Sequence, residues 1–384
     1  MLFKNLNMVT SQGIKKCDIL VENGKIKDIG SFSAKGIDFN GSMTIPSVID
    51  MHVHCRDFNQ SYKETVETAT MAAISKGVTG IVEMPNTSPP VNNEDIFEER
   101  RALFKEKAYC DYGINFSVTD DLSFFNGYKF IKIFLTETTG KLLFKGDLDK
   151  LFSYKKPIAV HSDINGIKEC VKLSIKYGTK LHVCHVSTKE EIEFLKRYKN
   201  ENITVEVTPH HLLLPKNSEN VKPDLGEKKD REALWKELGK TIDVIASDHA
   251  PHTKEEKKKG AYGIPGIETI LPLTLDFAFR KKISFETLAS LISENPAKIV
   301  SNKKGFGIGK DADFTVIEEK EWIVDSKKFY SKSKFSPFDG MKLKGTVKTV
   351  ILRGEIVYDG ETIKKISCKE MKSLYSLFAI DYRR

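Results

Sequence analysis

Short apolar runs alternate with longer mixed stretches through the middle of the chain, and this pattern predicts a β/α fold. The eight runs lie at 44–49, 78–84, 112–118, 130–135, 157–160, 180–186, 203–207 and 244–246. Runs of this length between helical or loop segments are typical of buried parallel strands. They predict a TIM barrel over 46–308. An open doubly wound sheet is the alternative, but no glycine-rich phosphate turn follows any run.

The two chain ends carry a different pattern, of short strands joined by tight turns. Apolar runs at 19–21 and 25–29 flank Glu22-Asn23-Gly24, which is a hairpin signal. Near the C-terminus, similar runs lie at 313–317, 349–352 and 355–358, with Gly354 between the last two. We therefore expect 1–45 and 309–384 to pair into one small β-domain, a β-sandwich beside the barrel.

Composition narrows the class of protein. The 384 residues are 40% hydrophobic and 30% charged, as in soluble domains, and we expect no membrane span and no signal peptide. Six cysteines without a CxxC pair favour free thiols in the cytoplasm. The net charge of +8 comes from lysines mixed with acids, without a nucleic-acid-binding motif. We therefore expect no nucleic-acid partner; the charge modestly favours an anionic small-molecule substrate.

Candidate metal ligands lie at the ends of the predicted strands, where barrel enzymes carry their chemistry. His52 and His54 are two residues apart, so on a strand they share a face. His161, His185 and Asp248 follow later runs, and all nine histidines lie near such ends. Five ligands are too many for one tetrahedral zinc with an open position. The pattern predicts two metal ions, which need a bridging anion.

Lys132 lies inside the apolar run 130–135 and is the candidate bridge. A buried ammonium ion is costly, but a neutral amine can add carbon dioxide and become an anionic carbamate. A lysine that reaches solvent or pairs with an acid is the alternative.

An ordered set of motifs connects these residues to a known family. The set is DMHVHCR at 50–56, MPNT at 84–87, KIFLTET at 132–138, LHVCHV at 181–186, PHHL at 209–212, SDHAPH at 247–252 and NPA at 295–297. It resembles the dihydroorotases of the amidohydrolase superfamily nearly end to end. The lysine-containing strand is most similar to the carboxylated-lysine dihydroorotases.

The resemblance implies the activity and the ligands. It implies reversible cyclisation of N-carbamoyl-L-aspartate to L-dihydroorotate in pyrimidine biosynthesis, by a metal-bridging hydroxide with Asp248 as general acid and base. Two zinc ions would be bound by His52, His54, carboxylated Lys132, His161, His185 and Asp248. Because many relatives bridge the metals with an aspartate, Asp120 or Asp121 is the competing bridge.

Substrate contacts follow partly from chemistry and partly from the resemblance. Arg56 shares the face of His54 and carries a fork suited to a carboxylate. The resemblance adds the side chains of Asn86, His252 and Thr138, backbone groups around Gly266, and Lys222 at a position that is often arginine or asparagine. One departure stands out: the usual Arg-Glu-Pro-Gly after the second histidine is RDFN at 56–59 here.

Other functions stay open. A hydantoinase or allantoinase would share the fold, metals and mechanism, although Arg56 would then have no carboxylate to bind. A metal-free homologue could be a structural or regulatory partner of aspartate transcarbamoylase, although the full ligand set argues against it. A homodimer, and association of an active enzyme with aspartate transcarbamoylase, also stay open.

Overall fold

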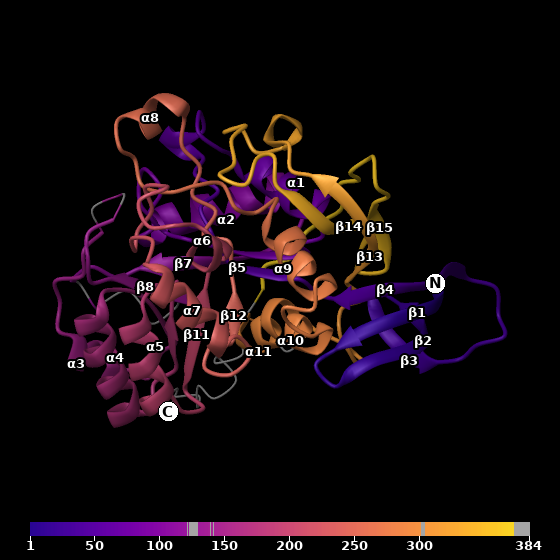
Figure 1. Ribbon diagram of the computed structural model, residues 1–384, viewed down its shortest axis with the longest axis horizontal. Coiled ribbons are helices and arrows are strands. Elements are labelled where there is room, and N and C mark those ends of the chain that lie inside the picture. The colour runs from indigo at the N-terminus through magenta and orange to yellow at the C-terminus, as the bar shows by residue number, and fades with distance from the viewer. Residues whose placement is uncertain (121, 123–129, 139, 141, 301–303, 372–384) are drawn as a thin grey trace.

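Eight parallel strands form the centre of the fold in the computed structural model, which describes all residues except 121, 123–129, 139, 141, 301–303 and 372–384 (Figure 1). Neighbouring strands pair in chain order. They are β5 (Ile49–Val53), β6 (Gly80–Glu83), β7 (Asp111–Ser117), β8 (Phe130–Phe134), β9 (Ile158–His161), β10 (Leu181–Val183), β11 (Ile203–Val207) and β12 (Val244–Ile245). The predicted barrel is confirmed.

The barrel closes between its first and last strands through residues next to the predicted ligands. The backbone N–H of His54 donates to the carbonyl of His249 at 2.8 Å, and the N–H of His249 donates to the carbonyl of His52 at 3.2 Å. Val53 and His249 form a parallel bridge there. Closure of the barrel therefore also brings His52 and His54 next to the segment that contains Asp248.

Helices surround the barrel and connect its strands (Figure 1). They are α1 (Val66–Ser75), α2 (Glu94–Lys107), α3 (Leu148–Ser153), α4 (Ile164–Tyr177), α5 (Lys189–Tyr198), α6 (Pro209–Leu213), α7 (Lys228–Glu237), α8 (Lys254–Lys258), α9 (Ile270–Phe279), α10 (Phe285–Ala289) and α11 (Asn295–Val300). None of the helices in the described ranges is long and apolar enough to cross a membrane.

Helix α4 illustrates how the sequence specifies these elements. The Asp163 side chain accepts hydrogen bonds from two backbone N–H groups of the first turn, which caps the helix. Ile167, Cys170 and Val171 recur at the spacing of one helical face and are buried. The helix ends at Gly178, whose φ of 67° is a left-handed conformation that glycine adopts without strain.

The first barrel strand begins later than predicted. Thr44, Ile45 and Pro46 belong to β4 (Ile37–Pro46) of the terminal sheet, and the chain passes Ser47 with φ 42° before β5 begins. The apolar run 44–49 therefore spans two strands of different sheets, which a run of hydrophobic residues cannot reveal. As a result His52 lies within β5 and not after a strand.

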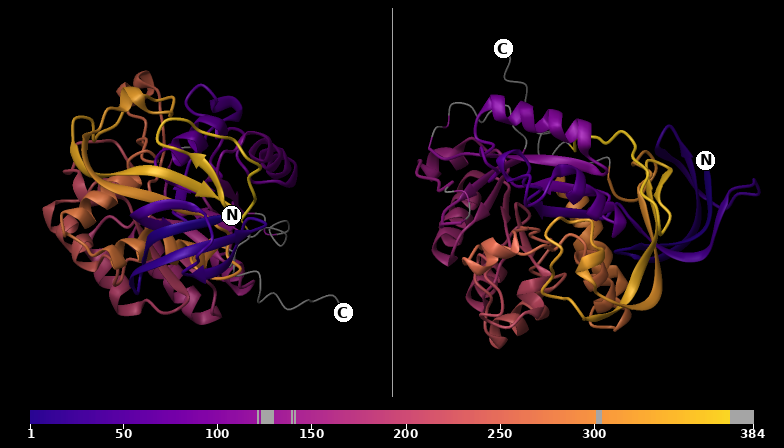
Figure 2. Two further views of the ribbon diagram at one scale, coloured as in Figure 1. Left: turned by 90° about the vertical axis from the view of Figure 1, so that its right-hand side faces the viewer. Right: turned by 90° about the horizontal axis from the view of Figure 1, so that it is seen from above.

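The two chain ends pair into one β-structure, as expected, and its strands form a single seven-stranded mixed sheet where a sandwich was expected. Its order is β15-β14-β13-β4-β1-β2-β3, with β1 (Leu2–Thr10), β2 (Gly13–Glu22), β3 (Lys25–Gly30), β13 (Phe314–Ile323), β14 (Lys342–Leu352) and β15 (Glu355–Tyr358). Its own core joins both ends, because Phe3 and Phe314 pack edge to face with ring centroids 6.2 Å apart. Figure 2 shows this sheet beside the barrel.

Candidate active site

A small pocket lies at the C-terminal ends of the barrel strands. It brings together most of the residues predicted from the sequence: His52, His54, Arg56, Asn86, Thr138, His161, His185, Lys222 and Asp248. The remaining wall consists of Phe134, Ala250, Tyr262 and Gly263. Lys132, His252 and Gly266 do not line it.

The first group of candidate ligands is His52, His54 and Asp248. The Nε2 atoms of His52 and His54 lie 3.4 and 3.2 Å from Oδ1 of Asp248. Two ligands bound at about 2.1 Å in a tetrahedral arrangement are separated by about 3.4 Å, so the three atoms fit around one zinc ion. All three side chains are buried.

The second group is His161 and His185. Nδ1 of His161 lies 2.9 Å from Nε2 of His185, and the rings of His52 and His185 have centroids 5.0 Å apart. Burial and the positive charge of Lys132 lower the pKa of His161 to about 3, and burial lowers the pKa of His54 to about 3. Both imidazoles are therefore neutral, which is the form that binds metal.

The carboxylates at the pocket floor are paired with histidines. Burial favours neutral Asp248, but His52 and His54 outweigh it and hold its pKa well below the ordinary value. Burial likewise opposes protonation of His52, but Asp248 and Glu206 raise its pKa to about 10. Glu206 is fully buried, with Oε1 2.9 Å from Nδ1 of His52. A metal ion would replace the proton that His52 holds between these carboxylates, and imidazole and carboxylate donors suit divalent metal ions.

Glu206 and Cys184 lie behind the predicted ligands. The Oε2 atom of Glu206 is 3.0 Å from Nε2 of His182, so its carboxylate contacts two histidines. Contact with Nδ1 of His52 orients that ring with Nε2 toward Asp248, as outer partners of metal ligands do. His52, Cys184 and Glu206 form a further group whose ligand atoms lie within 4.8 Å of one another.

Lys132 lies deeper in the barrel than the histidines. It pairs with Ser117 and Ala159, whereas Phe134 pairs with His161, so Lys132 is two residues, roughly 6 to 7 Å, below His161. It is fully buried, with Nζ 2.8 Å from Sγ of Cys184 and no ion pair to an acid within the described ranges.

The competing bridge has less structural support. Asp120 is exposed, accepts a hydrogen bond from the Thr119 hydroxyl at 2.9 Å and does not line the pocket. Asp121 lies outside the described residues.

Arg56 is a buried cation at the pocket wall, with 1% of its surface exposed. Its Nε donates to the carbonyl of Pro251 at 3.3 Å, and Nη2 lies 3.2 Å from Nε2 of His252. Nη1 is buried without a hydrogen-bond partner, and no carboxylate of the described chain forms an ion pair with the guanidinium. A buried guanidinium with a free donor needs an anion.

The other predicted substrate residues divide into two sets. Lys222 lines the pocket, but its Nζ lies 2.8 Å from Oδ1 of Asp224 and 4.9 Å from the Tyr262 ring centroid. His252 lies behind Arg56, and the backbone N–H of Gly266 donates to Nδ1 of His249 at 3.2 Å. The pocket wall also includes Ala250, which belongs to the motif at 247–252, together with Tyr262 and Gly263.

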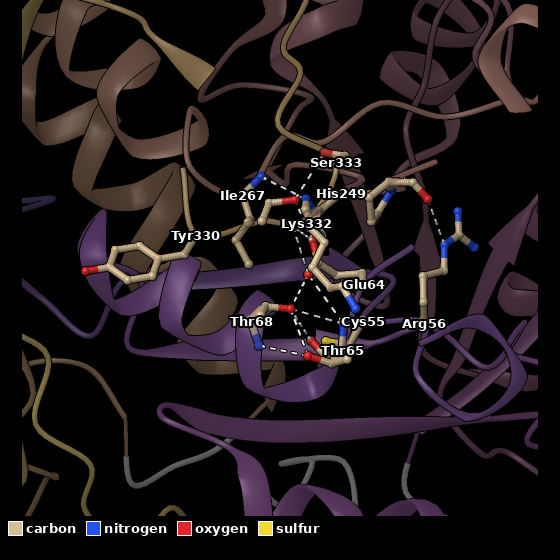
Figure 3. A network of polar contacts seen from close by, with 12 residues as sticks. Cys55, Arg56, Glu64, Thr65, Thr68, His249, Ile267, Tyr330, Lys332 and Ser333 are labelled. Carbon is tan, nitrogen blue, oxygen red and sulfur yellow. Dashed lines mark hydrogen bonds and ion pairs between the residues drawn. The ribbon is translucent and has the colours of Figure 1, made fainter. Parts of the chain in front are cut away.

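A buried polar network supports the pocket from outside (Figure 3). The Glu64 carboxylate accepts hydrogen bonds from the backbone N–H of Thr65 at 3.3 Å and of Lys332 at 3.2 Å, and lies 3.5 Å from Nε2 of His249. His249 follows Asp248 directly. Sequence reasoning missed Glu64, because its partners lie far from it along the chain.

Residues 43–357 match the Amidohydrolase family, and the chain therefore belongs to that family. A dihydroorotase from Pyrococcus abyssi is 37% identical over 371 residues, which are 89% of this chain and 91% of that protein. Multifunctional protein pyr1-3 of Dictyostelium discoideum is 35% identical over 365 residues, 87% of this chain and 16% of that protein.

Solved structures agree on the fold. An L-hydantoinase (dihydropyrimidinase) from Arthrobacter aurescens superposes with a TM-score of 0.87 at 25% identity, covering 97% of this chain and 99% of that chain. Within the amidohydrolase family, the curated relatives group this chain with the dihydroorotases. The resemblance inferred from the motifs is confirmed.

Proposed function

We propose that this protein is a dihydroorotase, which interconverts N-carbamoyl-L-aspartate and L-dihydroorotate in pyrimidine biosynthesis. The observation that carries this proposal is Arg56, which lines the pocket with a buried guanidinium whose Nη1 has no hydrogen-bond partner among the described residues. Dihydroorotate carries a carboxylate outside the bond that is cleaved, and a guanidinium is the side chain best suited to bind it.

The donor set supports two zinc ions per chain. One would be held by His52, His54 and Asp248, and the other by His161 and His185. Lys132, if carboxylated, would supply the anion that the two metal ions share. Lys132 forms no ion pair with an Asp or Glu of the described ranges, and its Nζ contacts Sγ of Cys184, which supports this role. Zinc ions bound here would supply a hydroxide nucleophile near neutral pH and polarise the ring amide carbonyl.

Asp248 moves the proton in this scheme. It is an ionised carboxylate at the centre of the first ligand group, so it can accept the proton of the attacking water. The carbon–nitrogen bond of the ring amide then breaks, and Asp248 returns the proton to the departing nitrogen. In the direction of synthesis the same carboxyl group takes the proton from that nitrogen and the ring closes with loss of water.

The remaining pocket residues orient the ring. Arg56 would fix the substrate carboxylate, and Asn86 and Thr138, which both line the pocket, would contact the ring and its polar groups. Lys222 would contribute little more than positive charge at the rim, because Asp224 already pairs with it. We assign His252 and Gly266 supporting roles, since they contact Arg56 and His249.

A hydantoinase or allantoinase is the main competing function. Their uncharged cyclic amides give Arg56 nothing to neutralise, so the buried guanidinium favours dihydroorotate. The test is an absorbance assay on dihydroorotate, hydantoin and allantoin, combined with metal analysis of protein prepared without chelators. We expect dihydroorotate to be hydrolysed and two zinc ions to be found; faster turnover of hydantoin or allantoin would overturn the assignment.

The setting of the enzyme is also a proposal. All six cysteines are free thiols, which supports a cytoplasmic compartment. The match to 16% of a multifunctional protein supports association with other enzymes of the pathway, such as aspartate transcarbamoylase. Size measurement of the protein alone and with that enzyme tests both this association and a homodimer.

A further inference from the structure

The segment that carries Arg56 has an unusual backbone. Arg56, Asp57 and Phe58 have φ of 55°, 57° and 46°, three consecutive left-handed residues of which none is glycine. Such conformations cost free energy for residues with a Cβ and persist only where the surroundings impose them. This segment is also where the sequence departs from the family's usual Arg-Glu-Pro-Gly.

Hydrogen bonds hold the segment from inside the loop. The backbone N–H of Asp57 donates to the carbonyl of Glu64 at 3.0 Å, which closes the loop at its base. The Asp57 side chain accepts from the N–H groups of Phe58 at 3.1 Å and Val66 at 3.0 Å. These contacts fix the residues that follow Arg56, but none of them touches its side chain.

A second set of contacts comes from the neighbouring strand and helix. Glu83, the last residue of β6, accepts the backbone N–H of Cys55 at 3.0 Å with Oε2 and the Nη2 of Arg100 at 2.6 Å with Oε1. Both charged side chains are fully buried. The guanidinium of Arg100 contacts two rings, with its Cζ 5.1 Å from the centroids of Phe58 and Phe104.

These contacts fix the chain both before and after Arg56. Glu83 binds the backbone of the preceding residue, and Arg100, held by the same carboxylate, stacks on the ring two residues later. Nε and Nη1 of Arg100 have no hydrogen-bond partner in the described chain, so the two rings are its main other contacts. Cation–π contacts are strong where the cation is desolvated, as it is here.

We propose that Phe58, stacked on Arg100, is a specificity-determining positioning residue that holds Arg56 ready for the substrate carboxylate. The inference rests on the proposed function, because it takes Arg56 as the carboxylate-binding group. A guanidinium fixed before binding loses little conformational entropy on binding, so loosening its loop weakens substrates with the carboxylate selectively. Rings without the carboxylate make no ion pair with Arg56, so their binding does not depend on Phe58.

The test variant is Phe58→Gly, which removes the ring while allowing the left-handed φ at that position. We expect KM for dihydroorotate to rise about three- to tenfold, with kcat within about twofold and zinc content unchanged. Hydrolysis of dihydrouracil, the same ring without the carboxylate, should not change. If relief of backbone strain were all that mattered, KM would stay the same or fall, and the inference would be wrong.

Phe104→Leu is the matched control, because Phe104 contacts the same guanidinium but belongs to α2 and not to the loop. It should lower the melting temperature without changing the ratio of KM values for the two substrates. Phe58→Tyr, which keeps a ring on Arg100, should retain the wild-type KM. Should Phe58→Gly fold poorly, Phe58→Leu keeps the bulk without the aromatic face and should show the same selective rise in KM.

Arg56→Met distinguishes a failure of the positioning role of Phe58 from a failure of the proposed function. Arg56→Met could abolish discrimination between the two substrates while Phe58→Gly leaves KM unchanged. The positioning role of Phe58 would then be wrong, and the proposed function would stand. If Arg56→Met itself leaves discrimination intact, the carboxylate role of Arg56 and the proposed substrate fail. Equal damage to both substrates in Phe58→Gly would make the ring a general structural residue and overturn the inference.

Discussion

The pocket floor and the loop at its rim are both buried, but they are built in different ways. In the floor, His52 belongs to β5, His54 directly follows it, and Asp248 lies three residues after the end of β12. The hydrogen bonds that close the barrel join His52 and His54 to His249, the residue after Asp248. At the rim, Arg56 belongs to a left-handed loop whose conformation depends on side chains from elsewhere, including Phe58 on Arg100. Strand register determines the floor, and tertiary contacts determine the rim.

This difference separates two kinds of chemistry. The floor brings nitrogen and oxygen atoms of the candidate ligands within 2.9–3.4 Å of one another, on strands whose backbone pairing positions them. In the proposed function the rim would select the substrate through Arg56. Changes to the floor should therefore abolish the reaction, whereas changes to the rim should alter which ring is accepted.

The largest effect is expected for Lys132→Ala, in the floor. Loss of the bridging group should remove bound zinc and lower kcat/KM by at least about 100-fold. Short carboxylic acids that mimic the carbamate should restore part of the activity. Steady-state kinetics with parallel zinc analysis measures both, and Lys168→Ala, an exposed lysine on α4, is the control. Full activity in Lys132→Ala would instead move the bridge to Asp120 or Asp121.

The floor was largely predictable from the sequence, and the reason is geometric. Side chains alternate along strands, and parallel strands end at the same edge, so His52, His161 and Asp248 could be brought together from their positions alone. The start of β5 was misjudged because the apolar run crosses from one sheet to another. Glu206 and Cys184 were near the predicted ligands, but their partners depend on side-chain packing.

The rim was only partly predictable. Chemistry and motif predict that Arg56 binds the substrate carboxylate, and that role stays a prediction. Nothing in the sequence RDFN at 56–59 predicts three consecutive residues with positive φ. Their conformation depends on Glu83 and Arg100, which lie far along the chain and carry no motif. Gly266 was expected at the substrate, yet its backbone N–H is used by His249. Tyr262 lines the pocket from a loop without a signature.

An intermediate effect is expected for Arg56→Met, at the rim. A charge-assisted bidentate contact contributes about 1.5–3 kcal/mol, or roughly one to two decades in rate. kcat/KM for dihydroorotate should fall at least tenfold, while zinc content and hydrolysis of dihydrouracil stay near the wild-type values. Arg56→Lys should recover only part of the loss, because an ammonium group keeps the charge without the fork. Loss of zinc from Arg56→Met would mean that Arg56 supports metal binding, and the proposed difference between a metal-binding floor and a substrate-binding rim would be wrong.

The smallest effect is expected for Lys222→Met, which tests whether any cation at the rim is sufficient. Lys222 lines the same pocket as Arg56, but its ammonium group is partly exposed and already pairs with Asp224 at 2.8 Å. Paired, solvent-exposed charges contribute little, on the order of 0.5 kcal/mol, so KM for dihydroorotate should rise by no more than about threefold. Raising the salt concentration should reduce even this difference, whereas the loss in Arg56→Met should persist because the guanidinium is buried. A tenfold loss in Lys222→Met that survives high salt would mean that the substrate carboxylate is bound at Lys222, and Arg56 would then need another anion.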